Sequence, residues 1–223
     1  QIWEFSNVNL VTALHRLARL GHHRCTAGRS CLAALQGRLL VTLEADRTPG
    51  GNLLAPRGLA GALWALAAAR SPEPALREAL SREAVQRLRD FNRQDVASTL
   101  WALAPLSSRR QDLVGALCQQ ALSKASSCDA QQLANVLWAS ATLQAWDADF
   151  VVALCNASLQ SIEDFAPQNL ANVMWAMAAM KEAQQQDLTA SIVDASLARV
   201  TAFRPQDFAN VVWAGATLML AGE

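Results

Sequence analysis

A tryptophan recurs along this chain at a nearly constant spacing. Trp64, Trp101, Trp138, Trp175 and Trp213 are separated by 37, 37, 37 and 38 residues. The residues around them also recur, and a sixth copy opens the chain with His15 in the tryptophan position. A period of this length is typical of repeat proteins, in which each repeat can bury its apolar sides only against its neighbours.

The residues before each tryptophan predict the start of a helix. Nine residues before it, three copies carry good N-caps, namely Ser6, Asn92 and Asp129. The other three copies place a proline at the first helical position: Pro56, Pro167 and Pro205. The third helical position carries residues suited to a capping box: Asp95, Gln132 and Asp207. A first helix of roughly 14 residues therefore begins each repeat.

A second helix follows in each repeat. Apolar residues recur there at i, i+4 and i+9, which we interpret as one buried stripe. The stripes are Leu76, Leu80, Val85; Leu113, Leu117, Leu122; Phe150, Leu154, Leu159; and Leu188, Ile192, Leu197. We therefore predict an all-α fold, a single α-solenoid fragment over residues 1–223 built from stacked two-helix repeats. The expected repeats span residues 5–53, 54–90, 91–127, 128–164, 165–202 and 203–223, with the last one incomplete.

The recurring tryptophan is followed by alanine in every copy that has it. Small neighbours allow helices to approach closely, so we expect each indole to be a buried wedge between repeats rather than a surface on which bases stack. Loss of one such buried ring would cost roughly 3–5 kcal/mol.

Several classes of function lack their sequence signals. The three histidines all precede residue 24, and no glycine-rich phosphate loop or nucleophile elbow is present. His22, His23, Cys25 and Cys31 match no zinc-binding spacing. We therefore expect no catalytic residues, no metal and no cofactor, and predict that the protein is not an enzyme. No apolar run approaches the ~20 residues of a membrane span, so we expect no membrane insertion.

Charge is distributed unevenly along the chain, although the net charge is zero. Residues 1–110 contain 15 basic and 8 acidic residues, a net of +7, whereas residues 111–223 contain 4 and 11, a net of −7. The two parts of the chain therefore present different electrostatic surfaces to partners.

The motif Pro-Gln-x-Leu-Ala-Asn-x-x-Trp-Ala-x-Ala-x-Leu resembles the octotricopeptide and heptatricopeptide repeats of algal and protist organelle proteins. It is also similar to the helical region of FAST-kinase-like and RAP-domain proteins. The best matches run from Pro167 to Met180 and from Pro205 to Leu218. The resemblance covers residues 5–221 and is weakest before residue 90, where His15 replaces tryptophan and Gly61 replaces asparagine. It implies a nucleus-encoded protein that enters chloroplasts or mitochondria and binds RNA for maturation, stability, translation or ribosome assembly.

Helical-repeat RNA readers use two or three side chains of one helix for each base. Three polar positions of the first helix are candidates for this role. Seven residues before the tryptophan lie Arg57, Gln94, Gln131, Gln168 and Gln206; three before it lie Ser98, Asn135, Asn172 and Asn210; six before it lie Asp95, Gln132, Asn169 and Asp207. Amides can both donate to and accept from base edges. Arg57 and Arg93 are candidates for contacts with phosphates.

Structural roles are open for the same residues. The asparagines could form a buried ladder between repeats, and the position six before the tryptophan is also the capping-box position. Each arginine could equally be a solvated surface residue.

Two functions follow as hypotheses. The first is a non-enzymatic organellar protein, soluble or peripheral in a chloroplast or mitochondrion, that contacts single-stranded RNA or rRNA through its first helices. The second is a protein-binding scaffold within a large organellar ribonucleoprotein or membrane-protein complex. Solenoids serve both uses. The exposure of one row of polar side chains discriminates between the two hypotheses, because an exposed row favours RNA binding and a buried row favours the scaffold. The row consists of Gln94, Gln131, Gln168 and Gln206 with Ser98, Asn135, Asn172 and Asn210.

Overall fold

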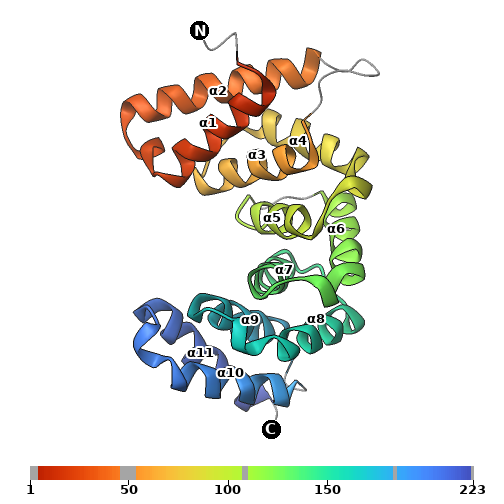
Figure 1. Cartoon of the computed structure of the whole chain (residues 1–223), viewed down its shortest axis with the longest axis vertical. Helices are drawn as coiled ribbons and strands as arrows, with labels where there is room; N and C mark the ends of the chain where they lie inside the picture. The colour runs from red at the N-terminus through yellow and green to blue at the C-terminus, as the bar shows by residue number, and fades with distance from the viewer. Residues whose placement is uncertain (1–4, 46–53, 107–109, 183–184, 222–223) are drawn as a thin grey trace. The chain divides into compact units, whose positions relative to one another are not determined.

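The computed structural model describes residues 5–45, 54–106, 110–182 and 185–221, which form eleven α-helices and no strand (Figure 1). The first helices of the repeats are α1 Asn7–Arg19, α3 Pro56–Ala68, α5 Arg93–Leu103, α7 Ala130–Leu143, α9 Pro167–Met180 and α11 Pro205–Ala221. The second helices are α2 Thr26–Ala45, α4 Pro74–Gln86, α6 Gln111–Lys124, α8 Ala148–Gln160 and α10 Gln186–Ala198. The predicted all-α fold of two-helix repeats is confirmed.

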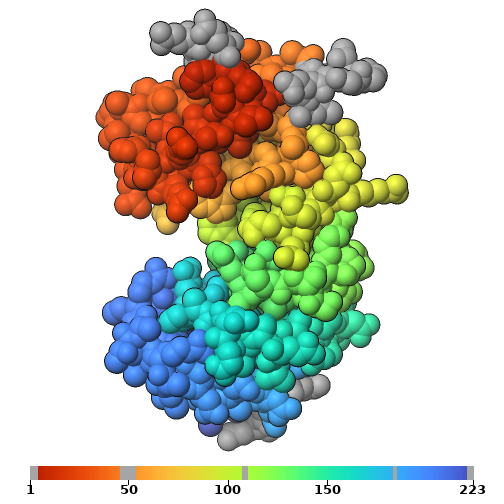
Figure 2. Space-filling model, viewed as in Figure 1, coloured from red at the N-terminus to blue at the C-terminus, as the bar shows by residue number. Residues whose placement is uncertain are grey.

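The chain divides into two compact units, Gln1–Ala116 (unit 1) and Leu117–Glu223 (unit 2). Within unit 1, α1 packs on α3 and α3 on α5, while α2 packs on α4. Within unit 2, α7 packs on α9 and α9 on α11, while α8 packs on α10. Consecutive repeats of a unit thus lie next to each other as bands of successive colour (Figure 2). Stacking of first helix on first helix and second on second is the packing of an α-solenoid.

The predicted helix starts are confirmed at the residue level. The Ser6 hydroxyl accepts from the backbone N–H of Asn9. Two complete capping boxes are present, one between Asn92 and Asp95 and one between Asp129 and Gln132. Pro56 and Pro167 occupy the first positions of α3 and α9, where a missing N–H costs nothing. Local sequence alone therefore sets where the first helices begin.

The interior of each unit is built from leucine and alanine, not from tryptophan. The residue before the tryptophan is fully buried in four repeats (Leu63, Leu100, Leu137 and Met174), and so is the alanine after it in five (Ala65, Ala102, Ala139, Ala176 and Ala214). The indoles of Trp64, Trp101, Trp138 and Trp175 are only partly buried, and Trp213 is 52% exposed. The prediction that the tryptophans are buried is therefore wrong, although Trp64 and Trp101, and Trp138 and Trp175, do contact each other between neighbouring repeats. Tryptophan lies at the edge of the apolar stripe, because it shares a helix face with polar positions three and seven residues earlier.

The predicted stripe of the second helix is correct at its first two positions and wrong at the third. Leu197, at i+9, is 62% exposed, and Val85 is also exposed. The third buried position is instead i+8, occupied by small residues: Ala84, Ala121, Ser158 and Ser196. Nine residues are two and a half turns of an α-helix, so i+9 points away from i, whereas i+8 stays on the same side.

Three first helices end in the same way. Arg70, Gln144 and Lys181 each lie six residues after the tryptophan and adopt left-handed backbone angles, with φ of 50°, 54° and 60°. The following residue donates back into the helix in each case, as in the bond from the Ala145 N–H to the Ser140 carbonyl, at 3.0 Å. This is the Schellman pattern, in which glycine is the usual left-handed residue.

Candidate functional site

One exposed face recurs on the first helices, and we call it the row face. It comprises the side chains seven and three residues before the tryptophan position, the tryptophan position itself, and the position four residues after it where the helix continues. Steps of 4, 3 and 4 residues keep all four positions within about 60° of the helix circumference. In α7 these residues are Gln131, Asn135, Trp138 and Thr142.

The row face of unit 2 is open to solvent. The glutamines Gln131, Gln168 and Gln206 are exposed. The asparagines Asn135, Asn172 and Asn210 are half-exposed, so they do not form a ladder buried between repeats. Of the two arrangements left open by the sequence, the structure has the accessible one. Gln94 and Ser98 have the same exposures in unit 1.

Hydrogen bonds along the helix orient some of these side chains. The Gln94 amide donates to the Ser98 hydroxyl at 2.9 Å, and the Gln206 amide donates to the Asn210 carbonyl oxygen at 3.0 Å. An amide has two N–H donors and two acceptor lone pairs, so the bond between Gln206 and Asn210 leaves capacity for a ligand. Gln206 and Asn210 therefore form a pre-oriented amide pair.

Aromatic rings lie on the same face and contact their counterparts in the next repeat. In unit 1, the ring centroids of His15 and Trp64 are 4.5 Å apart, and those of Trp64 and Trp101 are 6.1 Å apart. In unit 2, Trp138 and Trp175 are 6.3 Å apart. Such contacts add stability to the stack. Because each ring is incompletely buried, its exposed part belongs to the accessible surface.

Side chains at the third candidate position, six residues before the tryptophan, take part in contacts at the starts of the first helices. Asp95, Gln132 and Asp207 are buried. Asp95 and Gln132 accept from the backbone of their N-caps, as Asn169 does from the Ala166 N–H at 3.1 Å. Burial raises the pKa of Asp95, although the bond from Asn92 and the charge of Arg57 lower it.

Asp207 departs from the capping-box pattern. Its carboxylate accepts two bonds from the Arg204 guanidinium, at 2.7 and 3.0 Å. Asp95, Gln132 and Asn169 therefore cap helices, whereas Asp207 pairs with Arg204, and none of the four belongs to the row face.

The two units differ in the charge of their row faces. In unit 2 the row face is uncharged, and acidic side chains gather on second helices and turns, including Asp149, Glu163, Asp164, Asp187 and Asp194. Asp207 lies on the first helix α11, but it is buried and paired with Arg204. In unit 1 the row face carries Arg57 and Arg19, both exposed. Arg93 is exposed at the start of α5, beside the row face. Sequence reasoning missed Arg19, which could have been found because it lies one turn after His15.

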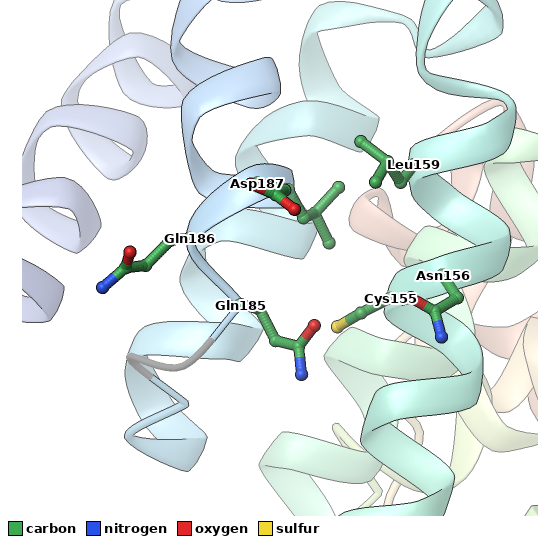
Figure 3. Close-up of a pocket in the computed structure, with 7 residues that line it drawn as sticks. Cys155, Asn156, Leu159, Gln185, Gln186 and Asp187 are labelled. Atoms are coloured by element: carbon green, nitrogen blue, oxygen red, sulfur yellow. The ribbon is translucent and has the colours of Figure 1, made fainter.

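A pocket of about 230 Å³ lies away from the row face, between α8 and α10 (Figure 3). Cys155, Asn156, Leu159 and Gln185 are among its lining residues, and Gln185 points toward Cys155. Burial, with a smaller effect of Glu182, raises the pKa of the Cys155 thiol to about 12. A thiol in this state is a poor nucleophile. The Cys155 thiol therefore does not suit this pocket for nucleophilic chemistry.

No described helix is long and apolar enough to cross a membrane. Among the described residues, no group of three or more His, Cys, Asp and Glu side chains is arranged to hold a metal ion. The row face is thus the recurrent accessible feature of this part of the chain.

Comparison with known proteins supports this view of the repeats. Residues 107–221, just over half of the chain, match the family described as Tbc2 translation factor, N-terminal domain. This match covers α6 to α11, where the repeat motif is best formed. No match was found among curated proteins. The chain belongs to the family of Tbc2 translation factor N-terminal domains.

Proposed function

We propose that this protein is a non-enzymatic, organellar RNA-binding protein that acts in translation or RNA maturation, and that its row faces contact single-stranded RNA. The observation that carries the proposal is the accessible row of amides and incompletely buried indoles on successive first helices. Amides can pair with base edges and indoles can stack on bases, and both groups recur once per repeat. A chloroplast or mitochondrial location and repeats of the octotricopeptide or heptatricopeptide type are parts of the same proposal.

The charge distribution is compatible with this use of unit 2. The acidic residues of that unit would repel phosphates if they lined the row face. Because they lie on second helices and turns or, in the case of Asp207, are buried and paired with an arginine, the uncharged row face can approach bases without an exposed carboxylate beside them. The family also fits the proposal, since it is named for a translation factor.

A row-face variant tests the proposal directly. Binding of 12-nucleotide single-stranded RNAs of random sequence is measured by fluorescence anisotropy at low salt, with Gln131, Asn135, Gln168 and Asn172 all replaced by alanine. We expect at least tenfold weaker binding, since one good amide–base pair is worth about 1–3 kcal/mol. The matched control replaces four exposed amides of second helices (Gln119, Asn156, Gln160 and Gln186) by alanine and should bind as the parent does. Absence of parent binding, or equal binding by both variants, refutes the proposal.

A scaffold function is the second candidate, and a different surface favours it. Val152 on α8 and Val193 and Leu197 on α10 are exposed apolar side chains on packed second helices. Exposed apolar groups that lie close together are common at protein–protein interfaces. Under this alternative, Leu197→Asp abolishes assembly into a larger complex while leaving RNA binding intact, as co-sedimentation of organelle extracts would reveal.

A further inference from the structure

The row face of unit 1 is chemically different from that of unit 2. Neither of its first two repeats has a carboxamide in the reading positions, which hold Val8 and Thr12 in α1, and Arg57 and Gly61 in α3. Base-edge pairing by amides is therefore not available there. The first two repeats instead present aromatic rings and cations.

The aromatic rings form a continuous column through unit 1. His15 contacts Trp64 with ring centroids 4.5 Å apart, and Trp64 stacks on Trp101 at 6.1 Å with an interplanar angle of 26°. The rings contact each other directly, so no base lies between them. Bases can meet only the uncovered parts of the rings. Gly61, one turn before Trp64, adds no side chain that would cover that ring.

Two arginines lie on the same face as the column. Arg19 follows His15 by one helical turn, and its charge contributes to lowering the pKa of His15, after burial. Arg57 precedes Trp64 by two turns and acts on Asp95 of the neighbouring helix α5. Both arginines are exposed to solvent.

We propose that the row face of unit 1 is a sequence-independent clamp for single-stranded RNA, in which Arg19 and Arg57 contact phosphates while His15, Trp64 and Trp101 contact bases. This inference rests on the proposed RNA-binding function. Cations that follow the backbone, combined with aromatic surfaces that accept any base, are the means by which proteins bind single strands without reading them. The charge of unit 1 is complementary to RNA, with 15 basic and 9 acidic residues, a net of +6.

The experiment measures how RNA affinity depends on salt for Arg57→Gln, which installs the residue that four other repeats carry at this position. Each lost phosphate contact lowers the slope of log K against log salt by about 0.7 for a single strand. We expect this decrease for Arg57→Gln and about 1.4 for the double variant with Arg19→Gln. The decrease should be the same for 12-nucleotide U, A and C homopolymers.

Arg89→Gln is the matched control, since it removes the same charge from an exposed position in the turn after α4. Equal slopes for Arg57→Gln and Arg89→Gln, with RNA binding retained, overturn the clamp and leave the proposed function standing. Absence of RNA binding by the parent protein overturns both.

Two tryptophan variants test whether the aromatic rings of the clamp contact bases. Trp64→Leu should weaken binding to all three homopolymers by about tenfold. Trp146→Leu, which changes an exposed tryptophan off the row face, should not. Thermal unfolding of both variants shows whether the fold is kept. A folded Trp64→Leu protein with parental affinity overturns the base-contacting role of the column.

Discussion

At the scale of single residues, the tryptophan position shows how one side chain can serve both packing and a surface. In five repeats it holds an indole that contacts the next repeat or lies open, and in the first it holds His15. Burial and the neighbouring Arg19 both lower the pKa of His15. The neutral imidazole is therefore the form that packs against Trp64.

This environment predicts a pH-dependent stability. Because the folded-state pKa of His15 lies below its ordinary value of 6.5, the unfolded chain binds the proton more readily. Stability present above pH 6.5 is then lost as the pH falls through the folded-state pKa. The midpoint of urea unfolding should fall more steeply between pH 7.5 and 5 for the parent than for His15→Phe. The same pH dependence in both proteins would contradict this account.

The exposure of the tryptophans could not be predicted from the sequence, whereas the caps could. Asn92 and Asp95 form their box through bonds between residues three apart, so local sequence determines it. Burial of Trp138 depends on how far the neighbouring helix covers it, which is set by packing. The positions of the amides at i and i+4 could be predicted from the sequence, but their exposure to solvent could not.

At the scale of elements, three first helices end in a strained backbone conformation that their sequences do not predict. Arg70, Gln144 and Lys181 adopt the left-handed conformation that glycine adopts without strain. That conformation costs a residue with a side chain roughly 1–2 kcal/mol. The helix-ending geometry is thus imposed by the turn into the second helix.

Gln144→Gly should therefore stabilise unit 2 by about 1 kcal/mol, after allowing for the greater flexibility of glycine in the unfolded chain. The free energy of unfolding in urea measures this gain. Asn156→Gly, at an exposed interior position of α8, should destabilise, because glycine is unfavourable inside a helix. Destabilisation by Gln144→Gly would show that its side chain makes contacts that outweigh the strain.

The second helices show the limit of reading stripes from apolar residues alone. Leu197 is apolar and exposed, whereas Ser196 beside it is buried. Helix geometry, with 100° per residue, would have selected Ser196 over Leu197 as the continuation of Leu188 and Ile192. The small residues at the third core position give no hydropathy signal, so a pattern of apolar residues does not identify that position.

At the scale of the whole molecule, the net charge of a unit does not describe the charge of its row face. Unit 2 has 4 basic and 10 acidic residues, a net of −6, yet its row face is uncharged. The sequence shows the imbalance, but only the helix faces show where the charges lie. The period and the helix starts predicted the fold class, and the repeat positions predicted where the amides lie along the helices. The accessible aromatic surface emerged only from the packing of helices.

The most direct test of the row faces as an RNA-binding surface is to map contacts with bound RNA. The protein is irradiated in complex with 4-thiouridine-labelled single-stranded RNA, and the cross-linked peptides are identified by mass spectrometry. The account predicts cross-links on the first helices α3, α5, α7, α9 and α11, concentrated at the tryptophan positions and the amide rows. Cross-links confined to the second helices, such as the exposed face of α8 and α10, would contradict it.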